Sequence, residues 1–262
     1  MSLTTTATEA LGTALLTAHE TQQPIAPLTT TAPDMTVEDA YGVQMHQVAA
    51  WKNAGRRVIG YKVGLTSLAM QKQLGVDQPD FGHLFDDMLL DASAPVSLAG
   101  FIAPRIEPEI SFVLSKDVTG PGLTIEELAD AVDHAVISLE IIDSRIADWK
   151  ITLADTIADN ASSGAVLVGE GTAQLDGVDL AALPVSMRRN GETVGEGVGA
   201  AVLGHPLEGA LWLANTLGSL GQTLPAGSLI MAGSITAAVA IAPGDTISAS
   251  FGELGTLDVT FA

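Results

Sequence analysis

The sequence reads Arg105-Ile-Glu-Pro-Glu-Ile-Ser-Phe-Val-Leu114 and, further on, Val136-Ile-Ser-Leu-Glu-Ile-Ile142, and these two stretches decide its fold. Both are rich in β-branched and aromatic residues and too short for core helices, so they predict two strands. Residues i and i+2 of a strand point to the same face, and Glu107 and Glu109 therefore project side by side. Glu140 lies in the second strand among apolar residues, which indicates a buried acid on the same sheet.

A group of three acids in such surroundings needs compensation. Adjacent carboxylates repel each other, and a buried carboxylate is costly without a cation or strong hydrogen-bond donors. An all-oxygen site suits a hard divalent ion, Mg²⁺ or Mn²⁺, and leaves positions open for substrate and water. The alternative is that Glu107 and Glu109 lie on a solvated strand face and Glu140 is an isolated acid with a raised pKa. Glu140 favours the metal site, because an acid inside so apolar a strand needs a partner.

The rest of the chain indicates an α+β protein with a largely β core and peripheral helices. Residues 1–56 are expected to form an N-terminal helical subdomain, and residues 57–262 the catalytic core. Apolar spacing, capping boxes and Pro206 at a first turn predict helices over 4–21, 36–51, 67–74, 124–134 and 205–217. Strands are expected over 57–65, 228–231, 245–251 and 256–261, and Asn190-Gly191 predicts a hairpin turn.

Composition excludes several classes of protein. The chain has 262 residues and a net charge of −20, and no cluster of Lys or Arg, which argues against partners such as nucleic acid and anionic membranes. No apolar run reaches bilayer-spanning length, and the first residues do not resemble a secretory signal. With no cysteine there can be no disulfide, thiolate ligand or thiol nucleophile, and we expect a cytoplasmic protein.

Two further residues are candidates for chemistry. Lys62 lies on a predicted strand between Gly60 and Gly64, which leave room for a ligand to approach the backbone. It could hold a carboxylate or act as an acid or base, or it could simply cover the sheet with its stem. Asp80, in Gln78-Pro-Asp-Phe-Gly82, is either a general base or a turn residue with no catalytic part.

The segment after the Glu140 strand is polar. Arg145 and Asp148 are expected to form an ion pair that fixes a loop. Residues 155–164 are dense in hydroxyl and amide groups, which either bind ligand oxygens or satisfy the backbone of a turn. Of the five histidines, none of which shows paired metal spacing, His83 is kept as a possible pocket residue.

Several motifs together resemble one known family. The stretches Gly60-Tyr-Lys-Val-Gly-Leu-Thr66, Gln73-Leu-Gly-Val-Asp-Gln-Pro-Asp-Phe-Gly82, Arg105-Ile-Glu-Pro-Glu-Ile110, Asp143-Ser-Arg-Ile-Ala-Asp-Trp149 and Asp159-Asn-Ala-Ser162 occur in this order in the 2-hydroxypenta-2,4-dienoate (2-keto-4-pentenoate) hydratases. These belong to the fumarylacetoacetate hydrolase superfamily and act in the meta-cleavage catabolism of aromatic compounds. The motifs are shared with the sister 2-oxo-3-hexenedioate (4-oxalocrotonate) decarboxylases.

The resemblance implies a mixed β-roll core and a homo-oligomer, often a pentamer or decamer, and a downstream aldolase or the sister decarboxylase as a partner. It implies that Glu107, Glu109 and Glu140 ligate Mg²⁺ or Mn²⁺. It places Lys62 and Asp80 at catalytic positions whose acid and base roles could be interchanged. Leu65, Ser162, Gly233 and Ser234 are implied as substrate-binding positions, although a strand residue and a plain turn are the alternatives for Leu65 and for Gly233-Ser234.

Hydration of a dienol acid to a 4-hydroxy-2-oxo acid is therefore the expected reaction. The closest alternative is decarboxylation of 2-oxo-3-hexenedioate, whose second carboxylate needs an additional cation that the sequence does not clearly supply. A reading of another class is a non-catalytic subunit that holds a decarboxylase or aldolase in a complex. Ser163 stands where relatives commonly show cysteine, which makes a catalytic thiol there implausible.

Overall fold

The computed structural model describes residues 2–67, 71–72 and 76–262. The helix expected over 67–74 therefore lies largely outside the described residues. The helices are α1 (Thr5–Thr21), α2 (Leu28–Thr31), α3 (Val37–Asn53), α5 (Ile125–Ala129), α6 (Leu153–Ala158) and α7 (Pro206–Ser219). The strands are β1 (Val58–Gly64), β2 (Asp80–Phe85), β3 (Leu89–Leu90), β4 (Arg105–Leu114), β5 (Val132–Ile142), β6 (Ser163–Ala173), β7 (Pro184–Arg189), β8 (Glu192–Val198), β9 (Leu229–Ser234), β10 (Val239–Ala240), β11 (Thr246–Ser250) and β12 (Thr256–Thr260).

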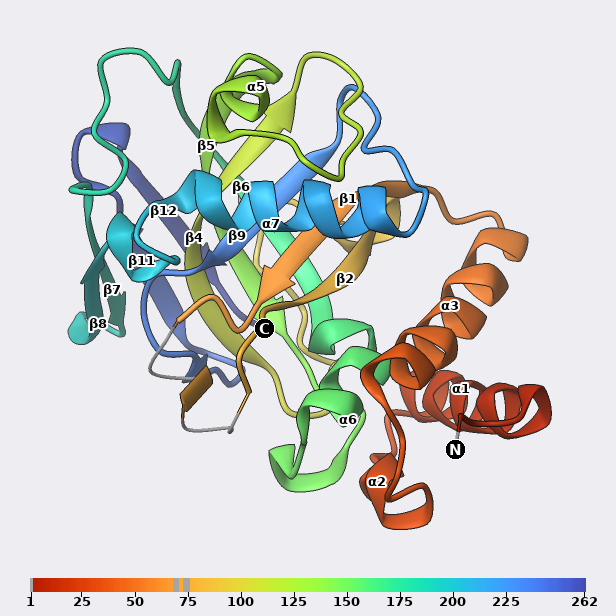
Figure 1. The fold of residues 1–262 in the computed structure, drawn as a ribbon. Helices are drawn as coiled ribbons and strands as arrows, with labels where there is room; N and C mark the ends of the chain where they lie inside the picture. Colours follow the sequence, from red (N-terminus) through yellow and green to blue (C-terminus); the bar gives the residue numbers. More distant parts are fainter. Residues whose placement is uncertain (1, 68–70, 73–75) are drawn as a thin grey trace.

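The strands of the described residues form two sheets (Figure 1). An eight-stranded sheet has the order β2-β1-β9-β4-β5-β6-β3, with β10 paired to β4, and it mixes parallel and antiparallel neighbours. A four-stranded antiparallel sheet has the order β12-β11-β7-β8. The expected α+β class with a mixed, largely β core is confirmed.

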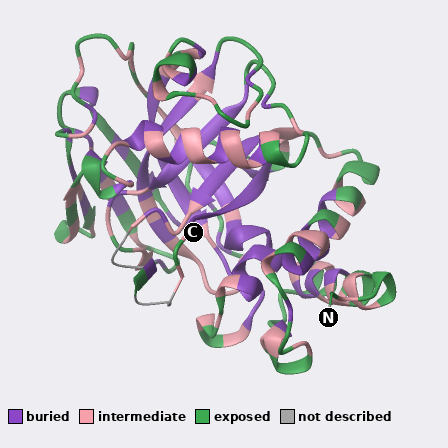
Figure 2. Ribbon diagram, in the orientation of Figure 1, coloured by how far each residue is buried: buried purple, intermediate pink, exposed green. Residues whose placement is uncertain are grey.

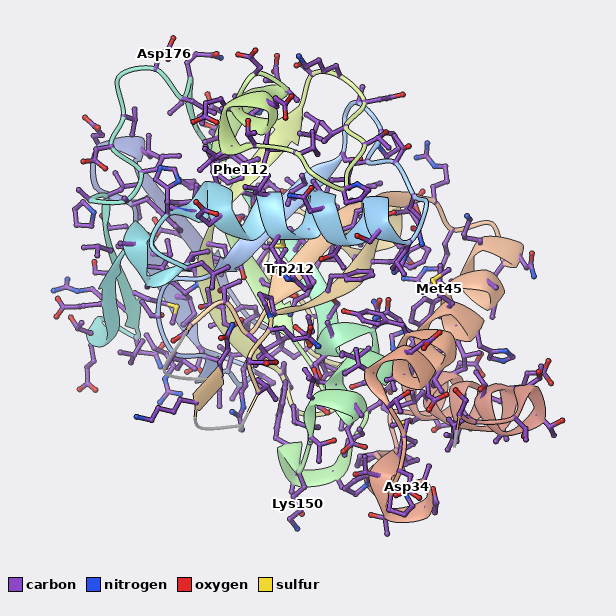
Figure 3. All side chains as sticks on the ribbon, in the orientation of Figure 1. Asp34, Met45, Phe112, Lys150, Asp176 and Trp212 are labelled. Atoms are coloured by element: carbon purple, nitrogen blue, oxygen red, sulfur yellow. The ribbon has the colours of Figure 1, made fainter. Side chains whose placement is uncertain are left out.

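The core lies between the sheets and under α7, which crosses the front of the large sheet in Figure 1. Helix α7 buries one face at helical spacing, through Leu207, Ala210, Leu213, Ala214 and Leu217. In Figure 2 the strands of the large sheet are mostly buried, whereas the N-terminal helices expose one face. Figure 3 shows the same contrast for side chains: Phe112 lies inside the sheet region, and Asp34, Lys150 and Asp176 lie at the periphery.

The N-terminal helices form a layer against α6. Leu15, Val43 and Ile157, from α1, α3 and α6, belong to one buried apolar cluster. Two buried glutamines of α3 reinforce this packing, since Gln44 Nε2 donates to the Ile157 carbonyl at 2.8 Å and Gln47 Nε2 to the Ala158 carbonyl at 2.6 Å. The layer therefore braces α6, the helix that precedes the predicted substrate loop.

Local signals located most elements correctly. The capping boxes at Thr36 and Thr124 are present, and Asn190 and Gly191 both have positive φ in a hairpin between β7 and β8. The helix expected over 124–134 is wrong at its end: α5 stops at Ala129 and β5 begins at Val132, because pairing with β4 extends the strand. Among the described residues, no helix is long and apolar enough to cross a membrane.

Candidate metal centre and active site

The three glutamates meet on one face of the large sheet. Strands β4 and β5 are antiparallel neighbours, and their register sets Glu107 directly opposite Glu140. Glu109 follows two residues along β4 and so points to the same face as Glu107. One carboxylate oxygen from each of the three side chains lies within 4.8 Å of the other two. The strand pairing thus brings together the residues that the sequence predicted as one site.

The carboxylates are buried and incompletely paired. Glu109 and Glu140 are almost completely buried, and Glu107 is half-buried. Among the described residues, Glu109 Oε1 and Glu140 Oε1 have no partner, and Glu140 Oε2 accepts no hydrogen bond and has only an ion pair with Lys62. Burial, with the charge of Glu140 beside it, raises the pKa of Glu107 to about 7, and burial also raises the pKa values of Glu109 and Glu140. Buried orphan oxygens of this kind fit a site for a cation.

Lys62 lies beside these acids on β1. Its Nζ is 3.4 Å from Glu140 Oε2 and donates to the Ala161 carbonyl at 3.0 Å. Burial acts to lower the pKa of Lys62, but the surrounding carboxylates, Glu140 first, outweigh it and the pKa is raised. The side chain is therefore an ammonium donor inside the site, and the surface position considered from the sequence is wrong.

The glycines on either side of Lys62 serve the protein backbone and Asp80. A Cβ on Gly60 would lie 1.9 Å from the Leu229 carbonyl oxygen of β9, so Gly60 permits the close pairing of these strands. A Cβ on Gly64 would lie 2.2 Å from Asp80 Oδ1. The sequence predicted that these glycines leave room for a ligand. In the structure the space beside Gly60 is filled by the Leu229 carbonyl, and the space beside Gly64 by Asp80.

Asp80 begins β2 directly opposite Gly64. It is buried, and this burial raises its pKa. Its Oδ2 accepts from Thr156 Oγ1 at 3.4 Å, whereas Oδ1 has no hydrogen-bond partner among the described residues. Asp80 is a strand residue and not a turn residue, and its carboxylate lies within the electrostatic reach of Lys62.

The predicted substrate-binding residues lie at different distances from this centre. Gly233 N–H donates to Glu109 Oε2 at 2.9 Å, and Ser234 lies opposite Glu109 in the strand register. Leu65 directly follows β1 with φ of 56°, and the adjacent Thr66 packs against Gly233. Ser162 does not contact the glutamates; its Oγ lies 3.4 Å from Thr156 Oγ1.

His83 lies outside the site. It pairs with Tyr61, and strand alternation directs both away from the face of Lys62. Its Nδ1 lies 3.1 Å from Oε1 of Gln44, a residue of α3, so the ring donates to this side-chain amide. Burial lowers the pKa of His83 to about 4. His83 lines a separate cavity of about 620 Å³ beside α3, so the expectation of a pocket residue holds for that cavity and not for the acidic site.

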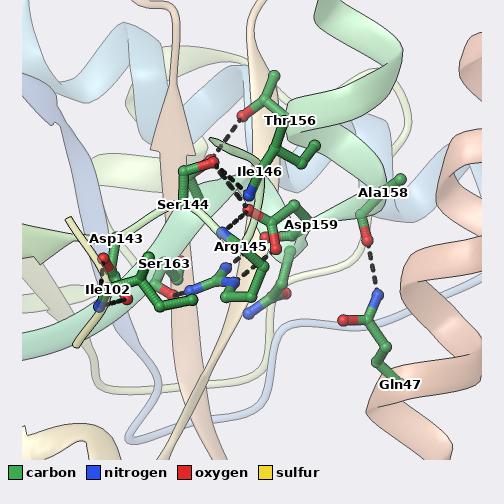
Figure 4. A network of polar contacts seen from close by, with 12 residues as sticks. Gln47, Ile102, Asp143, Ser144, Arg145, Ile146, Thr156, Ala158, Asp159 and Ser163 are labelled. Atoms are coloured by element: carbon green, nitrogen blue, oxygen red, sulfur yellow. Dashed lines mark hydrogen bonds and ion pairs between the residues drawn. The ribbon is translucent and has the colours of Figure 1, made fainter. Parts of the chain in front are cut away.

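The ion pair expected between Arg145 and Asp148 is wrong. Asp148 pairs with Lys150 at the surface, and Arg145 is buried against Asp159 (Figure 4). Arg145 Nε donates to Asp159 Oδ1 at 2.5 Å, Nη2 to the Asp159 carbonyl at 2.7 Å and Nη1 to the Ser163 carbonyl at 2.9 Å. The pairing follows the fold: the long, planar guanidinium reaches across the loop to the end of α6, which short spacing in sequence does not reveal.

This network holds an unusual turn. Asn160, Ala161 and Ser162 all have φ near +52°, the left-handed region that residues with a Cβ rarely adopt in succession. Asn160 is fixed to β2 at both ends of its amide, accepting from His83 N–H and donating to the His83 carbonyl. The turn thereby directs the Ala161 carbonyl at Lys62. The polar residues of 155–164 thus form hydrogen bonds with backbone groups and support the site, which was one of the two alternatives that the sequence left open.

Sequence reasoning missed two residues near the site, Thr156 and Arg105. Thr156 was part of a polar stretch with no individual signal, and only the fold brings it to Asp80. Arg105 lies on the same strand face as Glu107, and its charge counteracts the rise in the pKa of that glutamate. Its guanidinium is stacked 4.6 Å above the Trp149 ring. Strand parity with Glu107 could have identified Arg105.

Comparisons with known proteins agree with this geometry. The model of the fumarylacetoacetate (FAA) hydrolase C-terminal family matches residues 48–262. The chain is 45% identical to a 2-hydroxyhexa-2,4-dienoate hydratase of Comamonas testosteroni over 97% of each chain. It is 44% identical to a 2-keto-4-pentenoate hydratase of Paraburkholderia xenovorans (strain LB400), over 94% of this chain and 92% of that one.

A solved structure is similar over the whole fold. The 4-oxalocrotonate decarboxylase from Pseudomonas putida G7, complexed with magnesium and adipate, superposes with a TM-score of 0.96 and is 39% identical, covering 100% of this chain and 99% of its own.

Proposed function

The chain belongs to the fumarylacetoacetate hydrolase family, and we propose that it is a metal-dependent hydratase that converts 2-hydroxypenta-2,4-dienoate, or a 5-alkyl homologue, to 4-hydroxy-2-oxopentanoate. The observation that carries the proposal is the convergence of Glu107, Glu109 and Glu140 within 4.8 Å, with unpaired buried oxygens, beside Lys62 and Asp80. The hydratase relatives support the choice of reaction.

The donor set fits Mg²⁺ or Mn²⁺. Glu107, Glu109 and Glu140 would hold the ion, since carboxylate oxygens are the ligands that these hard cations prefer and several of them lack any other partner in the described chain. When bound, the ion supplies a Lewis acid for the carboxylate and the 2-oxygen of the substrate. The magnesium in the P. putida decarboxylase structure supports this assignment.

The reaction needs three atom movements. The proton of the enol hydroxyl leaves the 2-oxygen and a proton reaches C5. The result is an enone, in which the C3=C4 double bond is conjugated with the 2-oxo group. The oxygen of a water molecule then bonds to C4, and the proton that the water loses is balanced by one that reaches C3. The product is the 4-hydroxy-2-oxo acid, so no oxidant or reductant is required.

Lys62 and Asp80 divide this proton work. The ammonium of Lys62 has three donors, and its contacts with Ala161 and Glu140 leave one for an oxygen of the substrate that gains negative charge. Asp80 Oδ1 has no other partner among the described side chains and accepts the proton of the attacking water. Gly233, Ser234 and Leu65 border the substrate near Glu109, and Ser162 acts from behind Asp80.

A second candidate is decarboxylation of 2-oxo-3-hexenedioate, and one observation favours it. Arg105 lies on the strand face of Glu107 and is held on the Trp149 ring, and none of its side-chain nitrogens makes an ion pair with a described acid. It is the additional cation that a second carboxylate needs. The adipate in the similar decarboxylase structure is a dicarboxylate of the matching length.

One experiment separates these candidates. Enzymatically generated dienols with and without a terminal carboxylate are supplied with Mg²⁺ or Mn²⁺, and dienol absorbance and CO₂ release are followed together. A hydratase consumes the monocarboxylate without releasing CO₂, whereas a decarboxylase releases CO₂ from the dicarboxylate. Failure to turn over either substrate with either metal would reject the proposal. The remaining hypothesis would then be a non-catalytic subunit of a complex.

The assembly and the division of the chain are also proposals. We propose a homo-oligomer, a pentamer or decamer, that associates with the downstream aldolase or the sister decarboxylase. We also propose residues 1–56 as a helical subdomain that braces α6, and 57–262 as the catalytic core, supported by the glutamine contacts of α3. Analytical ultracentrifugation tests the first proposal, and limited proteolysis near residue 56 tests the second.

A further inference from the structure

The two oxygens of Asp80 have different surroundings. Oδ2 lies 3.4 Å from Thr156 Oγ1, within hydrogen-bond reach, and the threonine hydroxyl donates to it. Oδ1 is buried, accepts no hydrogen bond from a described residue, and lies where Gly64 leaves space for it on the Lys62 side. One oxygen is thus held from behind, and the other is presented to the site.

Thr156 is itself part of a chain of hydroxyl groups. Its Oγ1 lies 3.4 Å from Ser162 Oγ, and Ser162 Oγ lies 3.5 Å from Asp159 Oδ2. Asp159 is completely buried and paired with Arg145. Because each hydroxyl has a single proton, Ser162 can donate to Thr156 or to Asp159 but not to both while Thr156 donates to Asp80. When Ser162 donates to Thr156, the two hydroxyls form one directed chain towards Asp80, and Ser162 lies between Thr156 and the buried ion pair.

The far end of this chain is rigid. Arg145 donates to Asp159 and to the Ser163 carbonyl, and so clamps the end of α6 to the start of β6 (Figure 4). The start of α6 is fixed by the capping box of Thr152 and Asp155. Helix α6 spans only Leu153–Ala158, and both of its ends are fixed. The Thr156 side chain, which lies inside this short helix, therefore has little freedom to move its hydroxyl.

We propose that Thr156 is a positioning residue for the hydration step, which fixes the carboxylate of Asp80 through Oδ2 so that Oδ1 alone faces the reacting water. This inference rests on the proposed function. The contacts of 3.4 Å are long, as hydrogen bonds of acid–base residues often are before substrate binds, and they shorten in the substrate complex. Ser162 supports Thr156 from behind and has a smaller effect, because it does not touch Asp80.

A matched pair of variants separates positioning from space filling. Thr156→Val keeps the shape of the side chain and removes the hydroxyl, whereas Thr156→Ser keeps the hydroxyl and removes the methyl group. With Mg²⁺ and the dienol, Thr156→Val is expected to lower kcat on the order of 10-fold or more with KM within about 2-fold, and Thr156→Ser to retain most of kcat. Ser162→Ala lowers kcat less. A Thr156→Val kcat within about 2-fold of wild type, or an equal loss in Thr156→Ser, overturns the proposal.

A spectroscopic readout works without turnover and separates the two proposals. In protein with ¹³C-labelled aspartate carboxyl groups, the Asp80 signal is assigned from Asp80→Asn. Thr156→Val is expected to shift that signal and Thr156→Ser to leave it near its wild-type position; an unshifted signal in Thr156→Val contradicts the positioning role. Wild-type protein that hydrates no dienol would reject the proposed function, whereas active wild type with an unaffected Thr156→Val would reject only this inference.

Discussion

Two buried charged regions lie close together in this protein, and they differ in how their charges are paired. In the first, the guanidinium of Arg145 meets Asp159 and two carbonyl groups, so its donors have partners inside the protein. In the second, Glu109 and Glu140 keep oxygens that accept no hydrogen bond from a described residue, with Lys62 as the nearest cation. Both regions are almost completely buried.

The difference separates structure from function. A buried charge that is fully paired is needed for the fold, because removing its partner leaves the other charge without compensation. Buried charges of one sign that lack partners repel each other and are tolerated where a ligand completes them. Neutralising a residue should therefore destabilise the first region and change the stability of the metal-free second region little, and the predictions below test that contrast.

The largest effect is expected from Glu140→Gln. Loss of this carboxylate should lower activity by about 1000-fold or more, because the Lewis acid loses a ligand and its several kcal/mol of charge stabilisation. In the metal-free variant, relief of the repulsion on Glu109 offsets loss of the contact with Lys62, so the Tm should stay close to that of wild type, and added Mg²⁺ should no longer raise it. Kinetics and thermal unfolding with and without Mg²⁺ measure both.

The matched control is Glu170→Gln, which removes an exposed carboxylate from β6 and should change neither activity nor the Mg²⁺ response. Full activity in Glu140→Gln would remove the basis for the metal site.

Arg145→Met tests the paired region and should lower the stability of the protein. It leaves Asp159 buried without its cation, which costs about 3–5 kcal/mol of unfolding free energy. Urea unfolding measures this change. The control is Lys150→Met, which breaks an ion pair whose side chains are each 71% exposed and should cost less than about 1 kcal/mol. Equal stabilities of the two variants would mean that the buried pair contributes nothing.

His83 is a third kind of buried titratable group, one that stays neutral. Burial lowers its pKa from 6.5 to about 4. Between pH 6.5 and pH 4 the histidine is therefore protonated in the unfolded chain and neutral in the folded protein. The stabilising contribution is complete above pH 6.5 and is lost as pH falls to about 4, a change of about 3 kcal/mol. In His83→Gln, which retains a donor for Gln44, the difference between the unfolding free energies at pH 6.5 and 4 should shift by that amount relative to wild type; identical pH dependences would contradict it.

The sequence revealed the acidic site because the site follows strand rules. Glu107 and Glu109 share parity, and Glu140 stands out in an apolar strand, so local pattern was enough to group them. The catalytic roles of Lys62 and Asp80 could be predicted only from the family resemblance, since a lysine that covers a sheet and an aspartate in a turn are common in structures without a site. Their burial in the fold decides against those readings.

Long-range contacts were not predictable from sequence. The partner of Arg145 is 14 residues away, beyond helix α6, while Asp148 at three residues looked closer. Thr156 reaches Asp80 over 76 residues. The three left-handed residues at 160–162 carry no glycine, and only the surrounding clamp makes their conformation tolerable. These features arise from tertiary packing that overrides local preference.

The most direct test of the central claim is anomalous diffraction from crystals grown with Mn²⁺ and a 2-oxo acid. We predict one anomalous peak enclosed by carboxylate oxygens of Glu107, Glu109 and Glu140, on the Lys62 face of the sheet. A peak elsewhere, no peak at this position, or separate ions on separate glutamates would contradict the claim that the three side chains share one cation.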